Sequence, residues 1–137
     1  SIPFFNGDDY HPVANVKKMS EGIPLNDDDR HGWLIALNLL AKKHLEHGCI
    51  IACSALKEKY REALRKDIGN NVRMIYLEGS IEEIQERLTQ RKGHFMPTAL
   101  LKSQFDILEA PKEAITVTIA LTPSEIVGKI STLLTTT

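Results

Sequence analysis

The alternation of apolar and amphipathic segments constrains the fold of this chain more than any other feature. Four short apolar runs have the length and composition of β-strands, and the segments between them carry apolar residues at the spacing of an α-helix. The strand-like runs are IPFF (2–5), CIIACS (49–54), VRMIYLEG (72–79) and AITVTIAL (114–121). Strands that alternate with helices pair in parallel, so the sequence predicts an α/β fold with helices flanking a parallel sheet. Because CIIACS is apolar throughout, we expect its strand to be covered on both faces.

The predicted helices have start and stop signals of their own. The longest one follows PLNDDD and ends at Gly48, with Asn26 or Asp27 as its N-cap. Its buried face should carry Trp33, Leu37 and Leu40. Two further helices begin with capping boxes, formed by Ser80 with Glu83 and by Thr122 with Glu125. The remaining helical segments are PVANVKKM (12–19), ALKEKYREALRK (55–66) and ALLKSQFDILE (99–109).

Composition limits the classes of partner and compartment. The 137 residues fit one domain, and their formal net charge of −1 gives no global field that would attract nucleic acid or an acidic membrane. No apolar run reaches membrane-spanning length, and no signal peptide is visible. Cys49 and Cys53 lie in one apolar run, too far apart on a strand to form a disulfide. They predict reduced core thiols in a reducing, cytoplasmic compartment.

Polar side chains follow the first predicted strand, in NGDDYHP. Ligands of parallel sheets bind where loops leave the carboxyl ends of the strands. Asp8 or Asp9 could therefore accept a proton from a hydroxyl or hold a metal-bound water, and His11 could hydrogen-bond a substrate hydroxyl. The competing interpretation is a simple turn, since Asn, Gly and Asp readily supply turn dihedrals, and spacing alone favours it.

The segment PLNDDDR places three aspartates (27–29) directly before Arg30. Helix capping and the positive end of the helix dipole explain two of the carboxylates. They do not explain Arg30, because the dipole disfavours a cation in the first turn. Arg30 therefore either faces an anionic ligand or is held by a neighbouring aspartate, and the sequence leaves both possibilities open.

Two further segments carry positive charge. In CSALKEKYR, Ser54 and the following backbone N–H groups are expected at a helix start, which is a natural anion site, and Lys57 and Arg61 add charge one turn apart. A capped, solvated amphipathic helix is the alternative. In ERLTQRKGHFMP, cationic side chains surround a glycine. This pattern suits a mobile lid that closes over phosphates at about residues 87–97. A charged, solvent-facing turn would have a similar sequence. The cationic side chains are those of Arg87, Arg91, Lys92 and His94.

Taken in order, these segments closely resemble the gluconokinases, small gluconate kinases of the P-loop nucleoside-kinase superfamily. The matching text is DDYHP, then GIPLNDDDR followed by WL, then CSALK followed by YR, then RKGHFMP followed by SQF, and it covers nearly the whole chain. The resemblance implies a three-layer αβα kinase domain that transfers the γ-phosphoryl group of ATP to the 6-hydroxyl of D-gluconate, with Mg²⁺. It also implies a homodimer.

The resemblance further implies roles for individual residues. Asp8 would act in catalysis by orienting or deprotonating the acceptor hydroxyl, and would help to position Mg²⁺. The aspartates would cap their helix and fix Arg30, and the gluconate would be held by His11, Arg30, Lys57 and Arg61. Arg87 and Arg91 would belong to the lid, one against the adenine and one on the phosphates, with Arg91 acting in catalysis as negative charge develops.

The sequence departs from the family at one major point. The family begins with a strand, a G-x-x-x-x-G-K-[ST] phosphate loop and a helix, and no such glycine pattern occurs in this sequence. We therefore expect an N-terminally incomplete gluconokinase that does not phosphorylate gluconate by itself. The absent strand would stand in the middle of the sheet, between the strands at 49–54 and 72–79, whose edges would be left unpaired. Asn6 also stands where the family often has an acid, at an outer-sphere Mg²⁺ contact.

Two other functions compete with this expectation. One is a non-catalytic relative that binds gluconate or a partner chain without turning over ATP. The other is a related small-molecule kinase such as a shikimate kinase. It is the weaker of the two, because CSALK stands where that family carries a glycine-rich acceptor loop.

Overall fold

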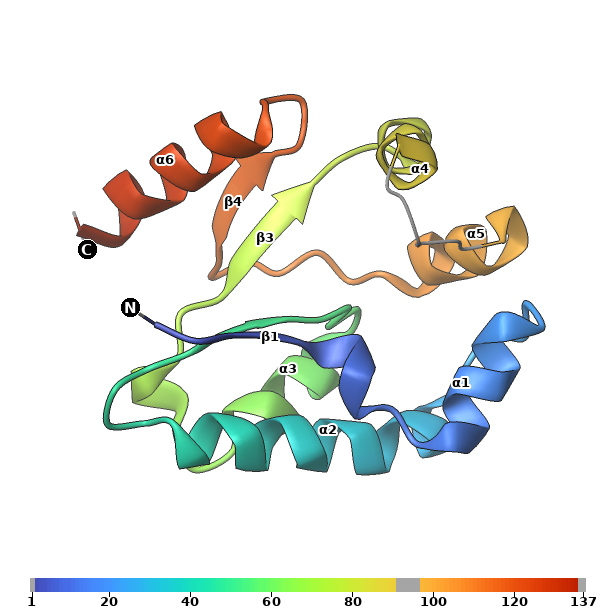
Figure 1. Ribbon diagram of the computed structural model, residues 1–137, viewed down its shortest axis with the longest axis horizontal. Coiled ribbons are helices and arrows are strands. Elements are labelled where there is room, and N and C mark those ends of the chain that lie inside the picture. The colour runs from blue at the N-terminus through green and yellow to red at the C-terminus, as the bar shows by residue number, and fades with distance from the viewer. Residues whose placement is uncertain (1, 91–96, 136–137) are drawn as a thin grey trace.

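The computed structural model describes residues 2–90 and 97–135 (Figure 1). Strands alternate with helices along the chain, and the strands pair in parallel, so the predicted α/β class is confirmed. The elements are β1 (Phe4–Asn6), α1 (Val13–Ser20), α2 (Asp27–Lys43), β2 (Ile50–Ala52), α3 (Glu58–Arg65), β3 (Ile75–Glu78), α4 (Ile81–Gln90), α5 (Thr98–Ile107), β4 (Ile115–Thr118) and α6 (Pro123–Thr135). Short 3₁₀ helices cover Gly7–Tyr10 and Gly69–Asn71.

The strands form two parallel pairs within the described residues, in agreement with the expectation that the facing edges of the strands at 49–54 and 72–79 are unpaired. β1 pairs with β2, with Phe4 opposite Ile50, and β3 pairs with β4, with Ile75 opposite Ile115. In Figure 1 the first pair lies over α2 and α3, and the second pair lies beside α6. The break between the pairs falls between β2 and β3, the place where the resemblance puts the family's first strand.

The prediction that residues 49–54 are covered on both faces is wrong. Ile50 exposes 54% of its surface and Ala52 is exposed, whereas Ile51 between them packs against the apolar core. Burial therefore alternates along β2, as in a strand with one covered face. The physical reason is that α2 and α3 cover one side of this pair, while Ile50 points to the other side.

The core of this half of the chain lies where α2 packs on α3. It consists of Trp33, Leu34, Leu37, Leu56 and Tyr60. Trp33 and Leu37 are almost completely buried, as predicted, and Leu40 packs at the margin of the cluster. Burying a side chain of this size stabilises a fold by about 1.5–3 kcal/mol, so this contact fixes α2 and α3 relative to each other.

Most helix ends follow the sequence signals. Asn26 is the N-cap of α2, where the Asp29 backbone N–H donates to Asn26 Oδ1 at 2.7 Å and the Asn26 N–H donates to Asp29 Oδ2 at 3.0 Å. The Ser80 and Thr122 capping boxes form as predicted. The prediction that the longest helix ends at Gly48 is wrong: α2 ends at Lys43 with His44 as its C-cap, and Gly48, with φ of +85°, closes the turn that follows by donating its N–H to the His44 carbonyl at 2.7 Å. The start of α3 differs, since this helix begins at Glu58 and not near residue 55.

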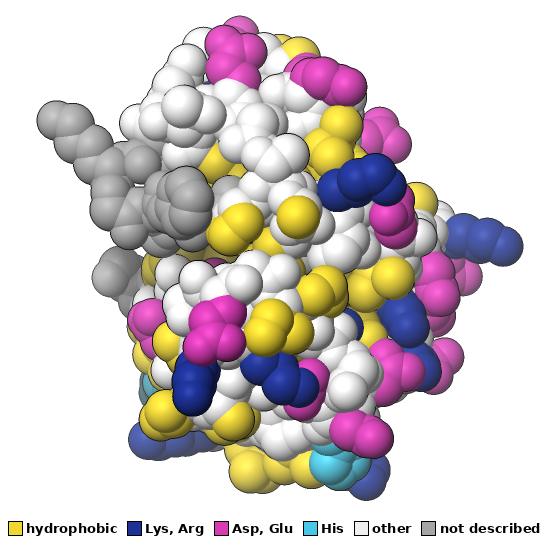
Figure 2. Space-filling model, turned by 90° about the vertical axis from the view of Figure 1, so that its right-hand side faces the viewer, with side chains coloured by type: hydrophobic (Ala, Val, Ile, Leu, Met, Phe, Trp, Pro, Cys, Tyr) yellow, Lys and Arg dark blue, Asp and Glu magenta, His cyan; other side chains and the backbone are white. Residues whose placement is uncertain are grey.

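The surface charges and the two cysteines are typical of a globular protein. Lys and Arg side chains are interspersed with Asp and Glu on the face that Figure 2 displays. Cys49 and Cys53 are both free thiols. Among the described residues, no helix combines the length and apolar character needed to cross a bilayer.

Candidate functional site

The loop after β1 places Asp8 at the carboxyl end of the β1–β2 pair. Asn6 caps the 3₁₀ turn by accepting a hydrogen bond from the Asp8 N–H at 3.1 Å. Gly7 is buried, and a Cβ at this position would lie 2.7 Å from the carbonyl oxygen of Ala52 and 2.8 Å from Cys53 Cβ. A side chain at position 7 would therefore push the ends of β1 and β2 apart. Asp8 itself is exposed, and no described residue donates a hydrogen bond to its carboxylate.

His11 lies against the core beside this loop. Its imidazole stacks on the Trp33 indole with ring centres 4.3 Å apart and planes 14° apart. The Trp33 Nε1–H donates to the Gly7 carbonyl at 2.7 Å, which ties the indole to the loop. Burial lowers the pKa of His11, the nearby charge of Asp8 opposes that shift, and the charge of Arg30 adds to it. Asp8 and Arg30 are thus both near enough to His11 to influence its charge.

Arg30 is buried at the start of α2, with 5% of its surface exposed. Its Nη1 donates to the Leu25 carbonyl at 2.8 Å and to the Tyr60 hydroxyl at 3.1 Å. The guanidinium carbon also lies 5.3 Å from the centre of the Tyr60 ring, a cation–π distance. The expectation that an aspartate fixes Arg30 directly is wrong for the described residues, because Arg30 reaches inward while the three aspartates stay on the outer first turn of α2.

Asp27 is linked to Arg30 through Tyr60. The Tyr60 hydroxyl donates to Asp27 Oδ1, Lys59 Nζ binds Oδ2, and Lys57 Nζ lies 3.3 Å from Oδ1. Hydrogen bonds from Lys59, Tyr60 and Lys57 hold the pKa of Asp27 well below its usual range. Lys57 also lies 5.7 Å from the centre of the Tyr60 ring. The starts of α2 and α3 are therefore joined by one network of charged hydrogen bonds.

Arg61 supports the loop before α3 from inside the protein. Its Nη1 donates to the Ala55 carbonyl at 2.6 Å, its Nη2 to the Glu109 carbonyl at 2.7 Å, and its Nε to Glu58 Oε1 at 3.4 Å. With 3% of its surface exposed, Arg61 has each guanidinium nitrogen engaged by protein.

The predicted anion site at Ser54 is not at a helix start. α3 begins four residues later, at Glu58. The Glu58 N–H instead donates to the carboxylate of Glu109, at 2.9 Å from Oε1. The positive end of α3 is therefore already satisfied by an acidic side chain of the same chain.

Arg87 lies in α4, and not at the starts of α2 and α3. Its Nη2 donates to the carbonyls of Ile119 and Leu121 at 2.6 and 2.7 Å, at the end of β4. Arg91 and the central part of the predicted lid lie outside the described residues. The sequence-predicted site residues thus fall into two groups. Asp8 and Arg30 both act on His11, Arg30 and Lys57 both contact Tyr60, and Arg61 holds the loop before α3. Arg87 instead lies in α4 and binds the segment after β4.

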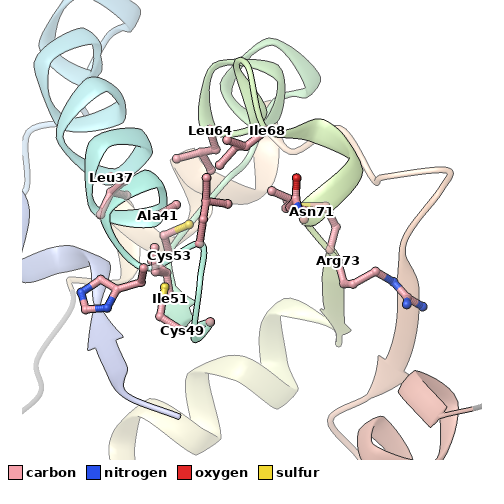
Figure 3. Close-up of a pocket in the computed structure, with 14 residues that line it drawn as sticks. Leu37, Ala41, Cys49, Ile51, Cys53, Leu64, Ile68, Asn71 and Arg73 are labelled. Atoms are coloured by element: carbon pink, nitrogen blue, oxygen red, sulfur yellow. The ribbon is translucent and has the colours of Figure 1, made fainter.

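Two cavities open beside α2, β2 and α3. One of about 250 Å³ opens between the end of α2, β2 and residues 72–74, and it is lined mainly by apolar side chains (Figure 3). Cys53 lines it, and burial, followed by the charge of Asp8, raises the pKa of this thiol to about 11. A larger hollow of about 880 Å³ lies between α3 and residues 109–115, with Arg61 in its wall. Neither cavity is lined by Asp8, His11, Arg30 or Lys57.

The side chains allow a limited test of cofactor binding. No group of three or more His, Cys, Asp or Glu in the described residues is arranged to hold a metal ion by itself. Mg²⁺ is commonly held by one or two carboxylates together with water and substrate phosphates, and the unengaged carboxylate of Asp8 fits one such ligand. The described residues offer no glycine-rich cradle for phosphates.

Two residues that bind the predicted site residues Arg30 and His11 were not predicted from the sequence to be functional. Tyr60 lies within the predicted helical segment 55–66, and nothing in the sequence indicated a partner for its hydroxyl. Asn15 is 2% exposed and binds both His11 and the backbone of α2. The sequence carries a weak indication for Asn15, because Asn is a poor helix former and this one lies inside a helix.

Comparisons with known proteins agree with one another. No protein-family model matches the chain. It is 51% identical over 116 residues to the thermosensitive gluconokinase of Escherichia coli, a match that covers 82% of this chain and 60% of that protein. The crystal structure of a gluconokinase from Sinorhizobium meliloti superposes with a TM-score of 0.82 at 40% identity, over 93% of this chain and 74% of that one. A sugar kinase from Janibacter superposes with a TM-score of 0.86 at 37% identity, over 97% and 79% of the two chains.

The chain covers only part of the length of curated relatives that it matches. It spans 60–65% of the length of three curated gluconokinases that it matches, from Xenopus tropicalis and Escherichia coli.

Proposed function

The chain belongs to the gluconokinase family, and from this premise we propose that it supplies the acceptor side of an ATP-dependent kinase acting on D-gluconate. The observation that carries the proposal is a series of neighbouring groups from three separate elements: an unengaged carboxylate and a cation that both act on one imidazole, and a second cation that contacts the same tyrosine as the first. These are Asp8, His11, Arg30 and Lys57. Such a set suits a ligand that has several hydroxyls and one negative charge.

The cations have different parts in holding the acceptor. Leu25 and Tyr60 fix Nη1 of Arg30, and no described residue accepts a hydrogen bond from its Nε or Nη2. A rigid guanidinium with two free donors matches the two oxygens of a carboxylate. Lys57 adds a point charge beside it, and Arg61 keeps the preceding loop in place.

Phosphoryl transfer needs a group that accepts the hydroxyl proton, and it needs positive charge near the phosphates. Asp8, with its free carboxylate, takes the proton of the 6-hydroxyl or contacts Mg²⁺. Bound Mg²⁺ supplies charge neutralisation on the phosphates of ATP. Arg87 and Arg91 belong to a lid at about residues 87–97 on the nucleotide side. A cytoplasmic location is supported by the free thiols, and a homodimer by the family likeness alone.

Gluconate binding by the 137-residue chain tests the proposal directly, by isothermal titration calorimetry. We expect Arg30→Ala, and the milder Arg30→Lys, to weaken binding tenfold or more, about 1.4 kcal/mol, because the charged fork is lost. Arg65→Ala is the matched control: this arginine pairs with Glu58 at 3.0 Å on the far end of α3, and its loss should change affinity less than about twofold. Wild-type protein without gluconate affinity, or an unaffected Arg30 variant, would remove the proposed acceptor site.

Catalysis by the chain alone is a separate proposal. We propose that turnover requires a phosphate-binding loop that the 137 residues do not contain. The chain should then form no 6-phosphogluconate from gluconate, ATP and Mg²⁺. Appreciable product would contradict this part.

A further inference from the structure

The side-chain amide of Asn15 bridges two parts of the candidate site. Asn15 is buried in α1, and its Nδ2 donates to the backbone carbonyl of Asp29 at 2.7 Å. A backbone carbonyl oxygen can only accept a hydrogen bond. The atom that faces Asp29 must therefore be the nitrogen of the amide, which fixes the orientation of the Asn15 side chain.

The same nitrogen determines the protonation of His11. Nδ2 lies 3.2 Å from His11 Nδ1, and an amide nitrogen has hydrogens to donate but no lone pair that accepts. His11 Nδ1 must then act as the acceptor and carry no proton. A neutral imidazole with a bare Nδ1 carries its proton on Nε2.

The surroundings hold the ring in one orientation and favour its neutral form. The stack on Trp33 fixes the ring plane, and the indole is itself anchored to the Gly7 carbonyl. An imidazolium ion carries hydrogens on both ring nitrogens, so the contact of His11 Nδ1 with the Asn15 amide nitrogen also favours the neutral ring. No described residue accepts a hydrogen bond from His11 Nε2.

We propose that Asn15 is a positioning residue that holds His11 as its neutral Nε2–H tautomer, so that His11 offers a ligand a hydrogen-bond donor. It follows that His11 is not the base of the reaction. A hydroxyl at this site would accept a hydrogen bond from His11 and donate its own proton toward Asp8. The identity of that hydroxyl as one of gluconate rests on the proposed function, whereas the tautomer does not.

The tautomer can be measured on the 137-residue chain without any ligand. Long-range ¹H–¹⁵N correlation spectra of protein labelled at histidine nitrogens distinguish the two neutral tautomers and the cation. At neutral pH we expect a pure Nε2–H pattern for His11, and the exposed His31 and His47 serve as internal references in the same spectrum. An Nδ1–H, averaged or cationic pattern at His11 would overturn the proposal.

A pair of matched substitutions separates this role from general support of the fold. Asn15→Asp presents oxygens that only accept, so His11 Nδ1 should gain a proton. Asn38→Asp makes the same change at the other buried asparagine that binds backbone, whose Nδ2 donates to Leu64 and Lys66 carbonyls at 2.9 and 3.1 Å. It should leave the His11 spectrum unchanged.

The variants and the unmodified protein together decide the proposal. An Asn15→Asp protein that folds and keeps the Nε2–H pattern contradicts it, and if that variant does not fold, the spectrum of the wild-type chain decides. Lost gluconate binding with the expected tautomer counts against the proposed function alone. Intact gluconate binding with an averaged tautomer counts against this inference alone.

Discussion

Replacing Tyr60 with phenylalanine isolates the hydroxyl that links the starts of α2 and α3. The ring is 2% exposed and belongs to the core, and phenylalanine retains its packing. What is lost is the oxygen that accepts from Arg30 Nη1 at 3.1 Å and donates to Asp27.

The cost can be worked out from the partners that remain. Asp27 is exposed and keeps both lysines and water, so we assign no stability loss to that side. Arg30 is buried and keeps the Leu25 carbonyl and the face of the ring. Losing a hydrogen bond to a buried charged group costs about 1.5–3 kcal/mol, and because these contacts survive we expect the lower end, about 1.5–2 kcal/mol.

Urea unfolding followed by circular dichroism measures this loss as a lower transition midpoint at unchanged slope. Tyr76→Phe is the control, since Tyr76 is partly buried in β3 and its hydroxyl has no hydrogen-bond partner among the described residues. That change should stay within about 0.5 kcal/mol. Equal midpoints for the two variants would refute the claim that the Tyr60 hydroxyl holds Arg30 in place.

Two further predictions concern the ends of β1 and β2. Gly7→Ala should destabilise the fold by about 1–3 kcal/mol, because its Cβ would meet the Ala52 carbonyl oxygen at 2.7 Å. Gly32→Ala in α2 is the control and should not destabilise the fold, since nothing lies within 4 Å of its Cβ. Similar urea unfolding midpoints for the two variants would contradict this prediction. Cys49 should be alkylated before Cys53, because burial raises the pKa of the Cys53 thiol to about 11 and that of Cys49 by less. Equal alkylation rates of the two cysteines in peptide mapping would disprove this prediction. Since the unfolded thiol ionises at lower pH, the contribution of Cys53 to stability is complete below about pH 9 and is lost as pH rises toward 11.

The features that could be predicted from the sequence are those whose partners are close along the chain. Each capping box joins residues three apart, so those at Ser80 and Thr122 were recognisable without any tertiary information, and Asn26 was one of two N-cap candidates. The left-handed conformation of Gly48 is also a local property, although the helix that it was expected to end stops at Lys43. The α/β class followed from the same kind of local periodicity.

The features that could not be predicted depend on distant partners. Tyr60 lies 30 residues from Arg30, and Glu109 lies 51 residues from the helix start that it satisfies. No pattern in PLNDDDR distinguishes an arginine held by an aspartate from one held by a tyrosine of another helix. The exposure of Ile50 likewise depends on which elements cover β2, and an apolar run does not report that.

The stacking of His11 on Trp33 has a practical consequence. Trp33 is the single tryptophan of the sequence, and its indole touches both the loop after β1 and the imidazole. Light absorbed selectively by tryptophan is therefore emitted from the edge of the candidate site and from nowhere else in these 137 residues. If the proposed function holds, gluconate bound at this site should change the fluorescence of Trp33, so its binding could be followed without a label.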